Sequence, residues 1–345
     1  MKKHVSRSTH SILGTRKVAW KPDTRLYTIG LTALVFVFSV GALSILFFHL
    51  PETPQAGLEP FPVGVDARTK TIEENPLAEA MLPSTGLKAT ALYAEEGLQR
   101  LIGSAAETSA YQLLAAAGAP SVAVVHSGFR KEEVVRSFDQ TLSWGADEEN
   151  AFLAAGEYDA EFLEGIFPAG LYTVSEGTTP EEVRALVDRR FAVQILDRYG
   201  TSTEEKVPLK DALVIASLIQ REAGSVGEMR MISGIIWNRL FSNMKLQVDA
   251  TVQYAKASES KRRVNWWPVM YPRDKYIKSP YNTYLEEGLP PGPIASPSVA
   301  AVIAALNPKK TDCYFYFHDA DGDFHCSPTY EEHVAALKKE YGRGK

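Results

Sequence analysis

Residues 209–223 carry their apolar side chains at the three- and four-residue spacing of a helix. Leu218 and Ile219 lie on its apolar face, and Glu222 follows them by four and three positions, on the same face. A carboxyl at the edge of an apolar face loses hydration, so its pKa rises and it can hold a proton for a leaving oxygen. The alternative is a Glu that bonds Arg221 or reaches water at the helix end.

A second helical pattern covers residues 225–240. Ser225 and Glu228 fit the capping box, in which each side chain satisfies a free backbone amide of the other residue. This gives Glu228 a structural explanation. The two helices, joined by a Gly-Ser turn, predict a helical hairpin with Glu222 at its apex.

Residues 246–254 alternate between polar and apolar side chains, which favours a β-strand. In that strand Gln247, Asp249 and Thr251 would share one face. Three polar groups in a row suit a ligand rich in hydroxyls. A solvated edge strand is the alternative.

Two loops follow, at 265–276 and 279–297. The first concentrates Trp and Tyr, whose ring faces could stack on sugars, lie at a membrane interface or pack within the loop. The second has a path restricted by Pro and Gly, and it offers the polar side chains of Asn282, Thr283 and Tyr284.

Cys313 and Cys326 flank a strand–turn–strand pattern with its turn at residues 319–322. Near the base of such a hairpin the two thiols would face each other, so an oxidising compartment could bridge them; two free thiols are the alternative. The nearby histidines lack the spacing of metal ligands. A helical hairpin, this small sheet and a closing helix from about residue 328 predict an α+β domain.

The N-terminal region has a different character. Residues 26–48 carry no charge and, as a helix, would span a hydrocarbon core of roughly 30 Å. Lys and Arg dominate residues 1–25, which places the N-terminus in the cytoplasm. We therefore expect a basic cytoplasmic tail over 1–25, one transmembrane helix over 26–50 and an extracytoplasmic remainder. A buried core helix is the alternative.

The remaining organisation follows from composition and pattern. Pro-rich residues 51–74 predict a stalk, residues 75–157 a small, mostly helical module, and residues 158–345 the domain that holds the candidate acid Glu222. Within these we expect a strand near 121–129 and helices over 130–142 and from Thr179-Pro180 onward. The formal net charge of −5 gives no sign of nucleic-acid binding.

The stretches "IASLIQREAG", "MKLQVDATVQYA" and "SPYNTYLEEGLPPGPIASP" occur in this order along the chain. Together they resemble the MltG (YceG-like) family of endolytic murein transglycosylases, over about residues 208–335. A weaker similarity continues upstream in "FLEGIFPAGLYTVSEGTTPEEV". The single predicted anchor also suits this family.

The resemblance implies a lyase of the bacterial cell membrane. It would cut nascent peptidoglycan between N-acetylmuramic acid and N-acetylglucosamine, leave a 1,6-anhydromuramoyl end, and need no metal or cofactor. Its expected partners are glycan strands, the lipid bilayer through residues 26–50 and peptidoglycan synthases. The family's catalytic acid maps onto Glu222. The polar side chains expected to hold the sugars are Gln220, Gln247, Asp249, Thr251, Asn282, Thr283 and Tyr284.

The chain departs from the family pattern at two places that bear on function. Gln220 stands where the family has a second Glu, and residues 75–157 show a divergent or missing LysM-like part. Two alternatives stay open. One is a non-catalytic envelope scaffold that binds glycan or synthesis proteins. The other is a hydrolase that pairs Glu222 with a second carboxylate such as Asp249.

Overall fold

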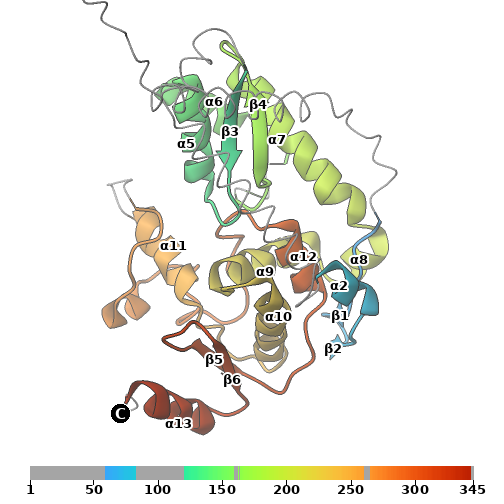
Figure 1. Ribbon diagram of the computed structural model, residues 1–345, viewed down its shortest axis with the longest axis vertical. Coiled ribbons are helices and arrows are strands. Elements are labelled where there is room, and N and C mark those ends of the chain that lie inside the picture. Colours follow the sequence, from blue (N-terminus) through green and yellow to red (C-terminus); the bar gives the residue numbers. More distant parts are fainter. Residues whose placement is uncertain (1–58, 83–119, 159–161, 163, 260–264, 343–345) are drawn as a thin grey trace, which may run out of the picture. The chain divides into compact units, whose positions relative to one another are not determined.

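The computed structural model describes residues 59–82, 120–158, 162, 164–259 and 265–342 (Figure 1). Within these ranges no helix is long and apolar enough to cross a membrane. The predicted tail over 1–25 and transmembrane helix over 26–50 lie outside the described residues, so both stay predictions.

The described chain mixes helices with three two-stranded antiparallel sheets, as the predicted α+β class requires. The strands are β1 (Val65–Asp66), β2 (Thr71–Ile72), β3 (Ser121–Val125), β4 (Gly170–Val174), β5 (Phe315–His318) and β6 (Phe324–Ser327). The α-helices are α2 (Pro76–Met81), α5 (Lys131–Leu142), α6 (Ala146–Ala154), α7 (Pro180–Gln194), α8 (Thr201–Lys206), α9 (Leu209–Glu222), α10 (Val226–Phe241), α11 (Asp249–Glu259), α12 (Val299–Leu306) and α13 (Tyr330–Tyr341). Two short 3-10 helices are η1 (Leu196–Arg198) and η2 (Pro272–Tyr276).

Helix α9 lies at the centre of the helical core, in contact with α10, α11 and α12 (Figure 1). Every residue from 212 to 219 is buried, so this helix is enclosed on all sides instead of on one face. Helix α10 approaches the chain after α12 closely, because a Cβ on Gly234 would lie 2.2 Å from the backbone oxygen of Lys309. The indole of Trp237 donates to the backbone oxygen of Ala305 (2.9 Å) and fixes α10 against α12.

The β3–β4 sheet pairs Ser121 with Val174 and Val125 with Gly170, and α5 packs on β3. The predicted helix starting at residue 180 is confirmed: Thr179 and Glu182 form a reciprocal capping box. The sheet corrects the predicted domain boundary between residues 157 and 158, since β3 precedes that boundary and β4 follows it. Strand pairing, which joins distant residues, has no signature in local composition.

The predicted stalk over 51–74 is also wrong for the residues from Phe61 to Val65. Phe61 is only 4% exposed and belongs to the hydrophobic core, together with Val65. The backbone N–H of Gly64 donates to the oxygen of Leu306 (2.9 Å), and the Asn307 amide donates to the oxygen of Pro62 (2.6 Å). Proline content does not show whether a segment packs against a domain, so the composition did not reveal these contacts.

The predicted strand over 246–254 is wrong, because Asp249–Glu259 forms helix α11. Its buried residues include Thr251, Tyr254 and Ala255, which recur at the i, i+3, i+4 spacing of a helix. Gln247 precedes the helix with a φ of 52°. Gln247, Asp249 and Thr251 therefore do not share a strand face.

The C-terminal hairpin and the closing helix are confirmed. Strands β5 and β6 pair Phe315 with Ser327 and His318 with Phe324, and α13 packs against both strands. A disulfide joins Cys313 to Cys326, with a Cα–Cα distance of 5.8 Å. Cys326 lies opposite Tyr316 in the ladder, so the bridge joins β6 to Cys313, two residues before β5, and not to a cross-strand partner.

Removing this bridge should destabilise the protein. A cross-link between positions 13 residues apart lowers the entropy of the unfolded chain, and this stabilises the folded protein by about 3 kcal/mol. We expect Cys313→Ser with Cys326→Ser, or reduction of the wild type, to lower the free energy of unfolding by roughly that amount, measured by urea denaturation. The double variant should not respond to reductant. An unchanged wild-type transition under reducing conditions would contradict the expectation.

Candidate active site

Glu222 is the last residue of α9 and is partly buried. The hydroxyl of Tyr316, on strand β5, donates to its Oε2 over 2.7 Å. The backbone N–H of Ala250, in the first turn of α11, donates to the same carboxyl. Three segments that are distant in sequence thus meet at one side chain.

The surroundings of Glu222 make it a weak acid. Burial raises the pKa of its carboxyl, because the charged form loses hydration, and the negative charge of Asp249 acts in the same direction. The Tyr316 hydroxyl, the Ala250 N–H and His318 act in the opposite direction. The net pKa lies above the usual value, which favours a protonated carboxyl that can donate its proton.

Asp249 and Tyr284 form a second carboxylate–tyrosine pair beside Glu222. The Tyr284 hydroxyl donates to Asp249 Oδ1 over 2.5 Å. Burial raises the pKa of Tyr284, and its hydrogen bond to Asp249 raises it further. Tyr284 therefore keeps its proton at neutral pH, and Asp249 sits at the start of α11, where the helix dipole favours a negative charge.

Glu228 has the structural role that the sequence predicts, although the predicted reciprocal capping box does not form. Its Oε2 accepts from the backbone N–H of Gly224 (3.0 Å) and lies 2.9 Å from His318 Nε2, while Oε1 accepts from the Ser225 hydroxyl (2.9 Å). Burial opposes ionisation of Glu228, but these hydrogen bonds hold its pKa below the usual value. Glu228 thereby anchors His318, and with it strand β5, to the turn after Glu222.

Arg221 does not pair with Glu222, although the two are neighbours in the chain. Its guanidinium lies 3.7 Å from the ring centroid of Trp267. The Trp267 indole in turn donates to Glu133 Oε2 (3.0 Å), and that oxygen also accepts the backbone N–H of Arg130 at the start of α5. The aromatic loop over 265–276 therefore contributes a packed contact beside the site, in addition to its exposed tyrosines.

Most of the predicted sugar ligands have partners within the protein. Gln220 accepts the backbone N–H of Ser298 (3.0 Å) at the start of α12. Thr251 and Thr283 are buried, and their hydroxyl oxygens lie 2.9 Å apart. Asn282 is fully buried, and its amide group donates to the oxygens of Lys275 and Ile277 and accepts from the N–H of Tyr284. These four side chains hold backbone segments together.

The other predicted ligands lie where a substrate could reach them or next to the acid. Gln247 is exposed and its backbone N–H donates to the oxygen of Thr283 (3.1 Å). Asp249 and Tyr284 belong to the group around Glu222. The sequence missed Tyr316 and His318, whose only signal was that Tyr314, Tyr316 and His318 carry polar tips on one face of the predicted strand.

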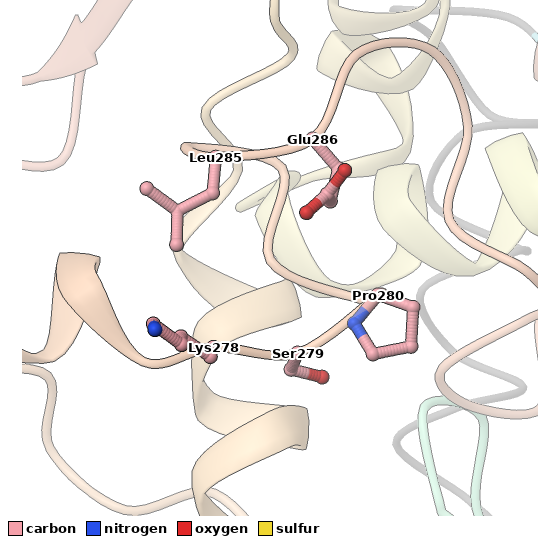
Figure 2. A pocket seen from close by; sticks show the side chains of 5 residues that line it. All are labelled: Lys278, Ser279, Pro280, Leu285 and Glu286. Carbon is pink, nitrogen blue, oxygen red and sulfur yellow. The ribbon is translucent and has the colours of Figure 1, made fainter.

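An open pocket of about 570 Å³ lies in the loop that carries Tyr284. Figure 2 shows Lys278, Ser279 and Pro280 on one stretch of the loop and Leu285 and Glu286 on the other. Its volume is in the range of small-ligand sites. Glu222 does not line this pocket. The candidate active site is therefore defined by the side chains around Glu222 and not by the pocket. Among the described residues no cluster of His, Cys, Asp or Glu could hold a metal ion.

The structural role of Asn282 can be tested directly. Asn282→Ala would remove the partner of two carbonyl oxygens and one N–H and leave a cavity at a fully buried position, so we expect a loss on the order of 3 kcal/mol in urea unfolding. Asn150→Ala, on the exposed face of α6, should change stability by less than about 0.5 kcal/mol. Unchanged stability combined with weaker glycan binding would show instead that Asn282 is a sugar ligand.

Comparison with known proteins identifies the family of this chain. Residues 73–339 match the model of the YceG-like family. The endolytic murein transglycosylase of Bacillus subtilis is 34% identical over 178 residues, which are 51% of this chain and 48% of that protein. The protein of the same name from Streptococcus pneumoniae is 31% identical over 176 residues, which are 50% of this chain and 31% of that protein.

A solved structure has a similar fold. A Listeria monocytogenes protein described as yceG-like superposes with a TM-score of 0.54 and 26% identity, covering 63% of this chain and 76% of that one. The matched part spans about half or less of the length of the curated relatives. Because the family model covers far more than half of the sequence and includes Glu222, Asp249 and Tyr316, the chain belongs to the YceG-like family.

Proposed function

We propose that this protein is an endolytic peptidoglycan lytic transglycosylase. It cleaves the bond between N-acetylmuramic acid and N-acetylglucosamine in nascent glycan strands and leaves a 1,6-anhydromuramoyl end. The observation that carries the proposal is the carboxyl of Glu222, which is partly buried at a helix end, held by two donors and biased toward its protonated form. Family membership and the names of the relatives support the same reaction.

The reaction needs one carboxyl group that acts first as an acid and then as a base. Protonated Glu222 gives its proton to the glycosidic oxygen as the bond from that oxygen to C1 of the muramoyl sugar breaks, and the sugar passes through an oxocarbenium-like state. The C6 hydroxyl of the same sugar then attacks C1 and closes the anhydro ring. Its proton goes to the Glu222 carboxylate, which restores the acid. Atoms and charges balance without water.

Asp249 supports this acid in two ways. Its negative charge raises the pKa of Glu222 and so keeps the donor protonated at higher pH. The same charge, fixed by the Tyr284 hydroxyl, favours the positive charge that develops on the sugar ring. Asp249 need not attack the sugar, because the nucleophile is part of the substrate.

The products distinguish the possible reactions. The protein is incubated with uncross-linked glycan strands, and the new ends are identified by mass spectrometry. Anhydro ends support the proposal. Reducing ends would show a hydrolase that uses water, and intact strands would show a non-catalytic glycan-binding scaffold; either result would contradict it.

Glu222→Gln removes the transferable proton but keeps the size of the side chain. We expect cleavage to fall by at least roughly a hundred-fold, since general acid–base groups contribute factors of this size. Glu331→Gln, at an exposed position in the first turn of α13, is the matched control and should cut like the wild type. Equal rates for Glu222→Gln and the control would show that another group is the acid.

The pH dependence tests the role of Asp249. The acid works when protonated, so kcat/KM should fall as pH rises through the pKa of Glu222. Asp249→Asn removes a charge that raises this pKa, so the fall should move to lower pH. Asp312→Asn, an exposed residue before β5, should leave the profile in place. A shift of the Asp249→Asn profile to higher pH, or none, would contradict the electrostatic role.

A further inference from the structure

The hydroxyl of Tyr316 meets the carboxyl of Glu222 from strand β5, 94 residues further along the chain. We propose that Tyr316 is a positioning residue for the acid, which holds Oε2 and leaves Oε1 to carry the proton that is delivered. An oxygen that already accepts the tyrosine hydroxyl is the poorer site for that proton, since the hydroxyl would have to turn away. This inference rests on the proposed transglycosylase reaction.

The hairpin fixes the orientation of Tyr316. Its ring stacks on Phe324 (centroids 5.6 Å apart, planes at 23°) and meets the His318 ring edge-on (6.5 Å, 88°). Across the ladder it pairs with Cys326, which the disulfide joins to Cys313. A tyrosine held by stacking, strand pairing and a covalent bridge loses little further freedom when it binds the acid, which is what a positioning residue requires.

Tyr316 acts only as a hydrogen-bond donor in this contact. Burial and the neighbouring Glu222 charge raise the pKa of its hydroxyl well above the usual value, and Arg239 opposes this only in part. The hydroxyl therefore stays protonated at any pH at which the protein works. Arg239 is itself fixed, because its guanidinium donates to the backbone oxygens of Tyr314 and Leu246.

The sign of the effect follows from all the groups that face Glu222. Asp249 from α11 raises the pKa of Glu222, and His318 from β5 lowers it. Tyr284 and Arg221 also interact with the Glu222 charge. Removing only the Tyr316 hydroxyl leaves these groups in place and deletes an interaction that lowers the pKa, so the pKa of Glu222 rises.

The test compares two tyrosines of the same segment. Tyr316→Phe should lower kcat/KM at the pH optimum roughly ten-fold, because the acid loses its orientation, and should move the alkaline limb of the profile to higher pH. Tyr314→Phe is the matched control. Its hydroxyl bonds Ser242 (3.3 Å) and not Glu222, so activity and profile should stay as in the wild type.

A second substitution covers the case in which Tyr316→Phe fails to fold. A ring-fluorinated tyrosine at position 316 keeps the ring and the hydroxyl but donates more strongly, so the alkaline limb should move to lower pH. Opposite shifts for the two substitutions support the inference. A Tyr316→Phe profile that coincides with the wild type, a loss of rate without a shift, or a fluorinated protein that shifts upward would overturn it. Failure of the wild type to cut glycan would instead refute the proposed function.

Discussion

The free energy needed to bury a carboxyl group constrains the whole site around Glu222. A carboxyl removed from water must either find donors or remain protonated. Here the carboxyl is at the end of α9, a helix that is buried on all sides. Strand β5 and the start of α11 each supply one hydrogen-bond donor. The donors hold the side chain in place, yet burial still keeps its pKa above the usual value. The same contacts therefore fix the position of the Glu222 side chain and influence its pKa.

Local patterns predicted the elements whose stability is decided locally. Helices α5, α7, α9, α10 and α13 follow from apolar spacing and caps, and the β5–β6 hairpin follows from alternation around a turn. Over so few residues, the segment 246–254 fits both the period of a strand and the period of a helix, and the strand prediction failed there. Its first-turn acid, Asp249, and the helix-forming residues after it were the signal for α11. The β3–β4 pairing and the packing of Phe61 depend on distant partners, so no local pattern reveals them.

The predicted site shows a similar division. Glu222 could be singled out because it lies on the apolar face of its helix. For Asn282, Thr251 and Thr283 the sequence shows only that they are polar, and whether a polar group binds a ligand or a backbone amide is decided by the tertiary structure. Gln220 illustrates this point. Its side-chain oxygen accepts the N–H of Ser298, as a glutamate oxygen could, so this contact does not require the missing charge.

The separation between Glu222 and Tyr316 also sets an order of events during synthesis. Ribosomes add roughly 5–20 residues per second, so the 94 residues between them take on the order of 5–20 seconds to appear. During that interval the acid exists without β5, and the cysteines that secure β5 have yet to meet. A chain released early would contain Glu222 and α9 but lack the strand that orients it. The site is therefore completed only after β5, which carries Tyr316, has been made.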